Sequence, residues 1–533
     1  MCDIIVSMAY DIVIKGGLVF DGSGNAPTVA DIGINGDRIA AIGSIRESGA
    51  ETVINAGNKY VTPGFIDVTN HSDTHLTLFK YPNLESLLMQ GVTTILGGNC
   101  GASLAPLGSR YALDAIRKWA DPSDINVNWD TVDSYLNALD LVRPGVNVGA
   151  FAGYGTLRRG VIGNEIRLLT LEEREQVKYL LRQALTDGAF GLSVGLAYGH
   201  EKVSTTEELI EIAKVLAETG GALKLHLRSE GAEILASVNE AVRIGRESGA
   251  PIRISHFKTI GRKAWPFFSN AIQIIENARA SGLDIMCDVS PYRTTGSPLY
   301  LLIPSWARQG GFAELFRRID TPDEQKKILE AMRGMTLHYD KILILSAKVK
   351  SAVGRTIQEI ADNTGFTPEE TLLQMVRVNE GRVSIIGRTV SGKNTASALM
   401  HRQSLIASDG AGYSQDAYRE GNLIHPRSFG AFPHFWHKFV TDTGKISASE
   451  AIQKLTAYAA RAFGIRERGE VRENYFADLL VFDPKLFRDR ATYKNPFRYP
   501  SGMEWVVVNG KIAVREGRPI GERAGRVLRR KET

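Results

Sequence analysis

The stretch that decides the fold is GFIDVTNHSD, residues 64–73, in which a short apolar run ends in a cluster of small polar residues. A run of this length, rich in β-branched and aromatic residues, predicts a buried strand. One histidine, His71, and one aspartate follow the apolar part directly. The stretch therefore predicts a strand whose carboxyl end carries groups that can bind a metal or move a proton.

The same pattern recurs along the middle of the chain, where apolar runs alternate with amphipathic segments such as TLEEREQVKYLLRQALTDG, residues 170–188. Continuous apolar strands separated by helices predict a parallel sheet that is covered on both faces. Eight or nine such units favour an α/β fold of the (β/α)8 TIM-like barrel type over an open sheet, with one run to spare. The nine runs are residues 64–70, 91–99, 145–153, 189–196, 222–226, 251–256, 283–290, 382–387 and 404–410.

Both ends of the chain are β-rich and contain turn signals, as in DIVIKGGLVFDGSG (11–24) and EWVVVNGKIAV (504–514). Asn-Gly between apolar runs is a strong hairpin signal. We therefore expect a small β-sandwich domain made of residues 9–62 and 470–525, beside a barrel over residues 63–469. Residues at about 298–352 contain a further helix and strand pattern, which predicts an insertion subdomain over the active-site face.

Composition favours an ordinary globular protein, with 43% hydrophobic and 23% charged residues and a net charge of +5. The basic residues are scattered, and GRVLRRKE (525–532) is expected to be a solvated tail, so no nucleic-acid partner is predicted. No apolar run approaches the roughly 18 residues of a membrane span. The oligomeric state is left open.

Cysteine usage and the N-terminal sequence bear on location. Cys2, Cys100 and Cys287 give no disulfide framework, which suits a reducing compartment. The start of the chain, MCDIIVSMAY, has an early aspartate and no basic region typical of a signal peptide. A cytoplasmic protein without a membrane partner is expected.

Five of the predicted strands end in side chains that can bind a metal or transfer a proton: His71, Cys100, His226, His256 and Asp409. In a barrel, the carboxyl ends of all strands open on one face, which holds the active site. Each residue alone has a simpler explanation, such as a hydrogen-bonded histidine or a small buried cysteine. Their repetition at equivalent positions predicts one shared site.

This set of side chains has a definite chemistry. Two histidines and one cysteine suit a borderline-soft divalent ion and leave a fourth position for water, the pattern of a catalytic zinc. Zinc lowers the pKa of that water to about 7. A nearby carboxylate, Asp409, would accept the proton and pass it to a leaving amine. The set predicts cleavage of an amide, an ester or a cyclic amide.

Several motifs carry a family likeness: QGVTTILGGNCGASLAPLG (90–108), HLRSEG (226–231), ISHFK (254–258), ASDG (407–410) and HPRSFGAFP (425–433). On these motifs the chain resembles the amidohydrolase superfamily and, within it, the N-acyl-D-amino-acid deacylases (D-aminoacylases). The likeness runs over roughly residues 9–520. The resemblance implies zinc-dependent removal of the acyl group from an N-acyl-D-amino acid, a small substrate with a carboxylate.

The resemblance also implies roles for individual residues. One tightly bound zinc is expected on Cys100, His226 and His256, with Asp409 as the catalytic acid and base. A cation, a phenol and a guanidinium suit the substrate carboxylate. The residues expected to bind substrate are Lys258, Tyr292, Arg427 and Tyr198, the last of which closes the motif GLSVGLAY.

The chain departs from the family at several positions. The usual His-x-His reads Thr69-Asn70-His71, so His71 is expected to bind a metal only at a looser second position, with His75 as a distant substitute. Tyr154 stands where the family usually has histidine, and residues 409–427 are longer than usual. Two alternatives to deacylation therefore stay open: altered chemistry, on another amide or by acyl transfer to an amine, and a vestigial binding protein.

Overall fold

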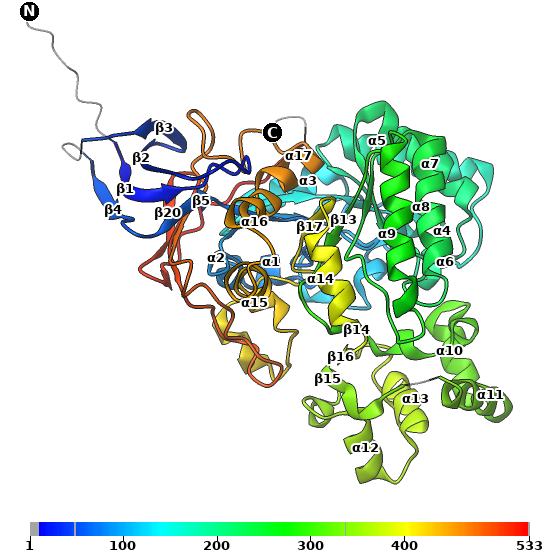
Figure 1. Ribbon diagram of the computed structural model, residues 1–533. Coiled ribbons are helices and arrows are strands. Elements are labelled where there is room, and N and C mark those ends of the chain that lie inside the picture. The colour runs from blue at the N-terminus through cyan, green and yellow to red at the C-terminus, as the bar shows by residue number, and fades with distance from the viewer. Residues whose placement is uncertain (1–9, 47–49, 336, 531–533) are drawn as a thin grey trace, which may run out of the picture.

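The computed structural model describes residues 10–46, 50–335 and 337–530, so Cys2 lies outside the described residues. Figure 1 shows three parts: a β sheet built from strands near both ends of the chain, a barrel wrapped by helices, and a small mixed lobe below the barrel. Within the described ranges, none of the helices is long and apolar enough to cross a membrane.

The barrel has eight parallel strands, as predicted. One sheet pairs β6, β7 and β8, and a second pairs β9 to β13 with β17. β8 and β9 are one run interrupted at Phe151, and a parallel bridge between Asn70 and Gly410 joins the ends of β6 and β17 and closes the ring. The strands are β6 (Phe65–Asp67), β7 (Val92–Gly97), β8 (Asn147–Ala150), β9 (Ala152–Gly153), β10 (Gly191–Gly195), β11 (Ala222–His226), β12 (Ile252–Ile254), β13 (Ile285–Val289) and β17 (Ser404–Ile406).

The helices outside the barrel bury one apolar stripe each. In α5 (Leu171–Thr186), Thr170 caps the first turn by accepting from the backbone N–H of Glu173, and Val177 and Leu181 are buried one turn apart. The other main covering helices are α3 (Val132–Val142), α4 (Tyr154–Ile162), α7 (Thr206–Thr219), α8 (Ile234–Ser248), α9 (Phe268–Ala280), α14 (Gly392–Met400), α16 (Ala448–Leu455) and α17 (Ala457–Phe463).

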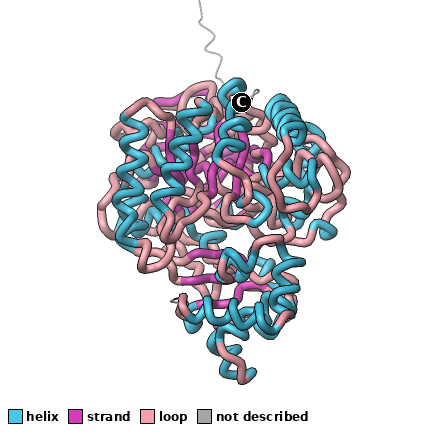
Figure 2. The backbone as a smooth tube through the Cα atoms, turned by 90° about the vertical axis from the view of Figure 1, so that its right-hand side faces the viewer, coloured by secondary structure: helices cyan, strands magenta, loops and turns pink. Residues whose placement is uncertain are grey.

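The spare ninth run lies outside the barrel. Its strand β16 (Ser384–Gly387) is the central strand of a small antiparallel sheet between β14 (Thr295–Pro298) and β15 (Ile342–Ser346), seen below the barrel strands in Figure 2. A short apolar run has the same pattern in either kind of sheet, so the sequence alone could not separate the two. The ninth run therefore belongs to the lobe.

The lobe has a hydrophobic core of its own, from Leu299 to Ile385. It thus extends beyond residue 352, because the central strand of its sheet comes last in the chain. Its helices are α10 (Gly311–Asp320), α11 (Pro322–Arg333), α12 (Ile357–Thr364) and α13 (Pro368–Val378).

The two ends of the chain form one nine-stranded sheet, in which β5 pairs antiparallel with β18. β1 changes partner along its length, from β4 to β5, around a register shift between Ile14 and Gly17. The strands of the expected β-sandwich domain therefore form one continuous sheet. Its strands are β1 (Ile12–Val19), β2 (Thr28–Asn35), β3 (Arg38–Gly43), β4 (Thr52–Asn55), β5 (Tyr60–Pro63), β18 (Leu479–Phe482), β19 (Met503–Val508), β20 (Lys511–Arg515) and β21 (Arg518–Pro519).

The segment after β21 is not the solvated tail expected from its charge. Val527 bridges to Val148 of β8 in parallel, and the backbone N–H of Leu528 donates to the Val148 carbonyl at 2.8 Å. The Leu528 side chain is 3% exposed and belongs to the cluster inside the barrel. Two apolar residues between arginines form an extended segment that covers the floor of the barrel, while Arg529 donates to the Asp187 carbonyl at 2.7 Å.

Candidate active site

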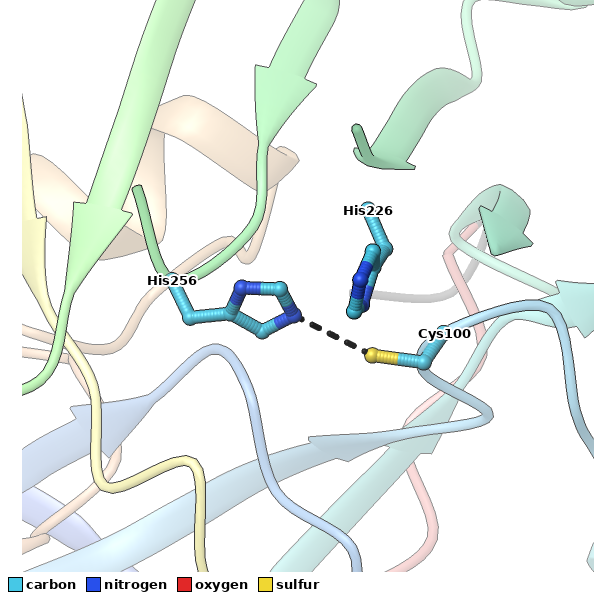
Figure 3. A group of neighbouring side chains, drawn as sticks. All are labelled: Cys100, His226 and His256. Atoms are coloured by element: carbon cyan, nitrogen blue, oxygen red, sulfur yellow. Dashed lines mark hydrogen bonds between the residues drawn. The ribbon is translucent and has the colours of Figure 1, made fainter. Parts of the chain in front are cut away.

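Cys100, His226 and His256 converge at the carboxyl ends of the barrel strands. Cys100 follows β7, His226 ends β11 and His256 follows β12. Their ligand atoms all lie within 4.8 Å of one another, and all three side chains are buried. Figure 3 shows the two imidazoles and the thiol pointing toward one another, with Cys100 Sγ 3.4 Å from His256 Nε2.

The backbone turns sharply where these side chains leave the strands. Cys100, His256 and Asp409 have φ values of 54°, 36° and 54°, in the left-handed region that non-glycine residues rarely adopt. Gly98 precedes Cys100, and a Cβ there would lie 2.2 Å from the Phe151 carbonyl oxygen. Strained backbone of this kind is typical of functional sites, where the surrounding structure holds it in place.

The charges around Cys100 favour its thiolate, the form that binds a metal. Burial alone would raise the pKa of the thiol, but the charge of His256 and hydrogen bonds from His226, His256 and His71 lower it well below its usual value. The buried Nδ1 of His226 has no hydrogen-bond partner among the described residues. Two imidazoles and a thiolate with room for a fourth ligand fit a catalytic zinc ion.

Glu230, which was not predicted from the sequence, holds His256 in position. Glu230 Oε1 lies 3.0 Å from His256 Nδ1 and accepts from Lys258 Nζ at 2.7 Å. Burial raises the pKa of Glu230, but the charge of Lys258 and then those of the two histidines lower it overall. Such carboxylate–histidine contacts orient metal ligands. The available signal was its place in HLRSEG, four residues after His226.

Asp409 lies between Arg427 and His71. Its Oδ2 accepts from Arg427 Nη1 at 2.6 Å, and its Oδ1 is 3.3 Å from His71 Nε2. Burial would raise the pKa of Asp409, but the charges of Arg427 and His256 and the contact with His71 lower it well below its usual value. Asp409 is therefore an ionised carboxylate at the mouth of the barrel.

His71 lies beside the three-ligand group but is not part of it. Burial lowers its pKa, yet hydrogen bonds to Asp409 and Cys100 raise it to about 9 overall. His75 lies further out, with its ring centroid 6.2 Å from that of His71, and packs beside Trp119. The structure thus brings His71 to the edge of the group and leaves His75 outside it.

Three of the predicted substrate-binding residues line one cavity with His256 and Asp409. The cavity measures about 420 Å³ including its opening to solvent, and Lys258, Tyr292 and Arg427 contribute to its wall. The Tyr292 hydroxyl is buried without a hydrogen-bond partner in the described part of the chain. Lys258 is already engaged, because it donates to Glu230 and, at 3.0 Å, to the His256 carbonyl.

Tyr198, the fourth predicted binding residue, packs on the other side of the centre. Its ring centroid lies 5.2 Å from that of His226, and Lys118 Nζ lies 3.4 Å from the centre of the tyrosine ring. Lys118 and Trp119 line a second, wider cavity of about 2300 Å³ including open solvent, which reaches Asp409 and the lobe. Neither residue was predicted from the sequence, because both lie between strands in a loop without a motif.

Tyr154, which stands where the family usually has histidine, lines neither of these two cavities. Its hydroxyl contacts Glu208, which forms a fully buried ion pair with Arg158 at 2.6 Å between α7 and α4.

In the long segment 409–427, Tyr413 and Glu420 line the wide cavity, whereas Tyr418 is 55% exposed. Only part of that segment is therefore placed to affect a substrate.

A closed eight-stranded barrel with a buried Cys-His-His group and an aspartate after its last strand defines a metal-dependent hydrolase. The sequence profile of the amidohydrolase family matches residues 52–322 and 391–514, and the chain belongs to this family. Residues 323–390, between the matched parts, make up most of the lobe. The chain is thus a hydrolase that acts on amide carbon–nitrogen bonds.

Similar proteins with known names indicate the branch of the family to which the chain is most similar. The chain is 31% identical to a D-aminoacylase of Alcaligenes xylosoxydans xylosoxydans, over 98% of both chains. A crystal structure of an N-acyl-D-glutamate deacylase from Bordetella bronchiseptica, complexed with zinc and a phosphonate inhibitor, covers 98% of this chain and 100% of its own at 29% identity, with a TM-score of 0.82. A D-aminoacylase structure described by its binuclear metal centre, one-metal activation and second-metal attenuation gives 0.81 at 31% identity, with 98% and 100% covered.

Proposed function

We propose that this chain is a zinc-dependent deacylase that hydrolyses N-acyl-D-amino acids. The observation that carries the proposal is the buried group of Cys100, His226 and His256, together with a cavity that both His256 and Asp409 line. The substrate class follows from relatives that match nearly the whole chain and are named as D-aminoacylase and as N-acyl-D-glutamate and N-acyl-D-aspartate deacylases.

Cys100, His226 and His256 would hold one zinc ion, with Glu230 and Asp288 fixing His256 through its Nδ1 and its backbone N–H. A bound zinc supplies Lewis-acid activation of water and of the amide carbonyl. Asp409 would accept a proton from water and return it to the leaving amine. Its contacts with Arg427 and His71 aim the carboxylate into the cavity.

The substrate carboxylate is best accommodated between Arg427 and Tyr292. The Arg427 guanidinium is a planar fork with donors beyond the one given to Asp409, and the Tyr292 hydroxyl is a buried donor without a partner. Lys258 fits a different role from the one expected, because its ammonium already binds Glu230. Lys258 would then act as a positioning residue that neutralises Glu230 behind His256.

Hydrolysis is favoured over acyl transfer to an amine. Aminolysis needs a mouth that keeps water out. Here Asp409 and Arg427 also line the wide cavity, which opens to solvent between the barrel and the lobe. Water therefore has direct access to the reacting end of the site. A vestigial binding protein is disfavoured by the complete set of donors around the centre.

The test is a combined metal and substrate assay on protein purified without chelators. Zinc per chain is measured by elemental analysis, and release of free amino acid is measured on matched N-acyl-D- and N-acyl-L-amino acids, with Asp409→Asn as the inactive control. The expected result is bound zinc and activity on D substrates only. Fully zinc-loaded protein that cleaves none of the D panel would overturn the proposal.

A further inference from the structure

A buried lysine, Lys224, lies directly behind the proposed zinc centre. It belongs to β11 and precedes His226 by two residues, so both side chains point into the barrel and Lys224 lies one layer deeper. Thr69 also precedes its histidine, His71, by two residues, just after the end of β6. Thr69 and Lys224 are each 0% exposed. Their strands are not neighbours in the barrel, and the two side chains meet across its interior.

The Lys224 ammonium is fully engaged. It donates to the Thr69 hydroxyl at 2.6 Å and to the Val68 carbonyl, and it lies 3.5 Å from Asp288 Oδ2. These three partners match the three N–H groups of a lysine. Below the ammonium, the rings of Phe151 and Phe463 lie with their centroids 5.6 and 5.5 Å away. Lys224 is therefore a fixed, paired cation in an otherwise closed floor.

The position beside the Lys224 ammonium offers few side chains that could bind a second metal ion. His71 and Asp409 face each other there at 3.3 Å, but Thr69 supplies a hydroxyl that already accepts from Lys224. Asp409 is also paired with Arg427. Among the described residues, the group of three or more potential ligands that lie close together is Cys100, His226 and His256. A second divalent ion beside His71 would also be repelled by the ammonium.

We propose that Lys224 takes the place of a second metal ion, so that its ammonium supplies the positive charge behind the centre and restricts the protein to one zinc. The inference rests on the proposed zinc site but goes beyond it, because it assigns the metal count to a residue outside that site. The inference also changes the expected effect of placing a histidine at position 69. A Thr69→His substitution alone would place an imidazole against the Lys224 ammonium, and a second ion would still be excluded.

The experiment counts zinc by elemental analysis after dialysis against excess zinc and removal of free metal. Four full-length proteins are compared: the natural chain, Thr69→His, Thr69→His with Lys224→Ala, and Thr69→His with Lys454→Ala. Lys454 is the matched control, because it is also a buried lysine but donates to the His401 carbonyl, away from the centre. The double variant with Lys224→Ala is expected to bind about two ions and the other three about one.

Three results would overturn the inference. Two zinc ions in the natural chain or in Thr69→His would show that Lys224 does not exclude the second ion. Two in the Lys454 control would show that loss of any buried lysine is enough. One in a Lys224→Ala double variant that keeps its cooperative thermal transition would show that the lysine is not what limits the count.

Failure of the proposed function and failure of this inference give different results. No zinc in the natural chain would instead refute the proposed function. If Lys224→Ala prevents folding, the double variant Thr69→His with Lys224→Ser is measured in its place. In either case, two zinc ions per chain in the Thr69→His single variant would contradict the inference.

Discussion

Arg427 Nη1 donates to Asp409 Oδ2 at 2.6 Å, so the proposed carboxylate-binding residue and the proposed acid–base residue form an ion pair across the cavity. The two side chains are 14% and 13% exposed, which places the pair at the boundary between the buried centre and solvent. A substrate carboxylate that reaches Arg427 would therefore meet a guanidinium that is already aligned by Asp409.

Arg427→Ala is expected to raise KM by about 10- to 100-fold, because a hydrogen bond to a charged group is worth roughly 1.5–3 kcal/mol. Arg427→Lys keeps the charge but loses the planar fork, and it should recover only part of the affinity. Steady-state kinetics on one N-acyl-D-amino acid measure both. A fall in kcat at unchanged KM would mean that Arg427 acts only through Asp409.

Asp409→Asn should keep its zinc and lose about 10²- to 10⁴-fold in turnover, the usual contribution of a positioned proton-transfer group. The amide has nearly the shape of the carboxylate, so the backbone contact from its N–H to the Thr69 carbonyl at 3.0 Å is preserved. Zinc content and kcat are measured on the same preparation. Loss of zinc from this variant would indicate that Asp409 is a metal ligand and not mainly an acid–base group.

Cys100→Ala should abolish tight zinc binding, because the thiolate is the charged member of the three donors. Cys287→Ala is the matched control: Cys287 is also a buried free thiol, but its Sγ lies 4.0 Å from the Gln403 carbonyl and outside the group. Elemental analysis of both variants gives the comparison. Equal zinc in the two would remove Cys100 from the proposed ligand set.

Glu230→Gln should weaken zinc binding by about 10- to 100-fold without removing a ligand, as substitutions behind metal-bound histidines do. Competition with a chelator of known affinity measures the change. Glu240→Gln is the control, because Glu240 is a partly buried carboxylate that pairs with Arg228 at 2.7 Å. Similar losses in both variants would point to a general effect on the barrel mouth.

The ion pair of Arg158 and Glu208 makes a prediction about stability. Removing one member, as in Arg158→Met, leaves an unpaired buried charge and should cost about 3–5 kcal/mol. The double variant Arg158→Met with Glu208→Leu should recover most of that loss, because both charges are gone. Thermal unfolding midpoints of the two variants test this. A double variant less stable than either single one would show that the pair is a net stabilising contact.

The sequence predicted the barrel because its signal is local and repeated. Most strands are nearly continuous apolar runs, and five of the predicted strands end in a metal-binding or acid–base residue such as Cys100 or His226. The run at residues 382–387 was ambiguous because a short stretch such as RVSIIG looks alike in a barrel and in a small antiparallel sheet. The position of Leu528 depends on a contact with a strand 380 residues earlier in the chain, which no local pattern contains.

The residues of the site also fall into those that a local sequence pattern reveals and those that it does not. Its reactive groups could be found because each follows a predicted strand, and a barrel brings such positions together. Glu230, Lys118 and Lys224 could not, because their importance lies in side-chain contacts that only the folded chain creates. Lys224 in particular looks like an exception to an apolar strand until its partners Thr69 and Asp288 are seen. The roles of the predicted ligands and substrate contacts stay predictions.

The antiparallel pair of β5 and β18 has a consequence for how the protein is made. β5 leads directly into β6, the first barrel strand, yet its partner β18 lies more than 400 residues later, and the floor residue Leu528 comes later still. The ribosome therefore releases the whole barrel sequence before β18 can pair with β5 and before Leu528 can cover the floor of the barrel. Nascent chains would expose apolar residues of this floor through most of synthesis, so we expect them to be prone to aggregation until the C-terminal segment is made.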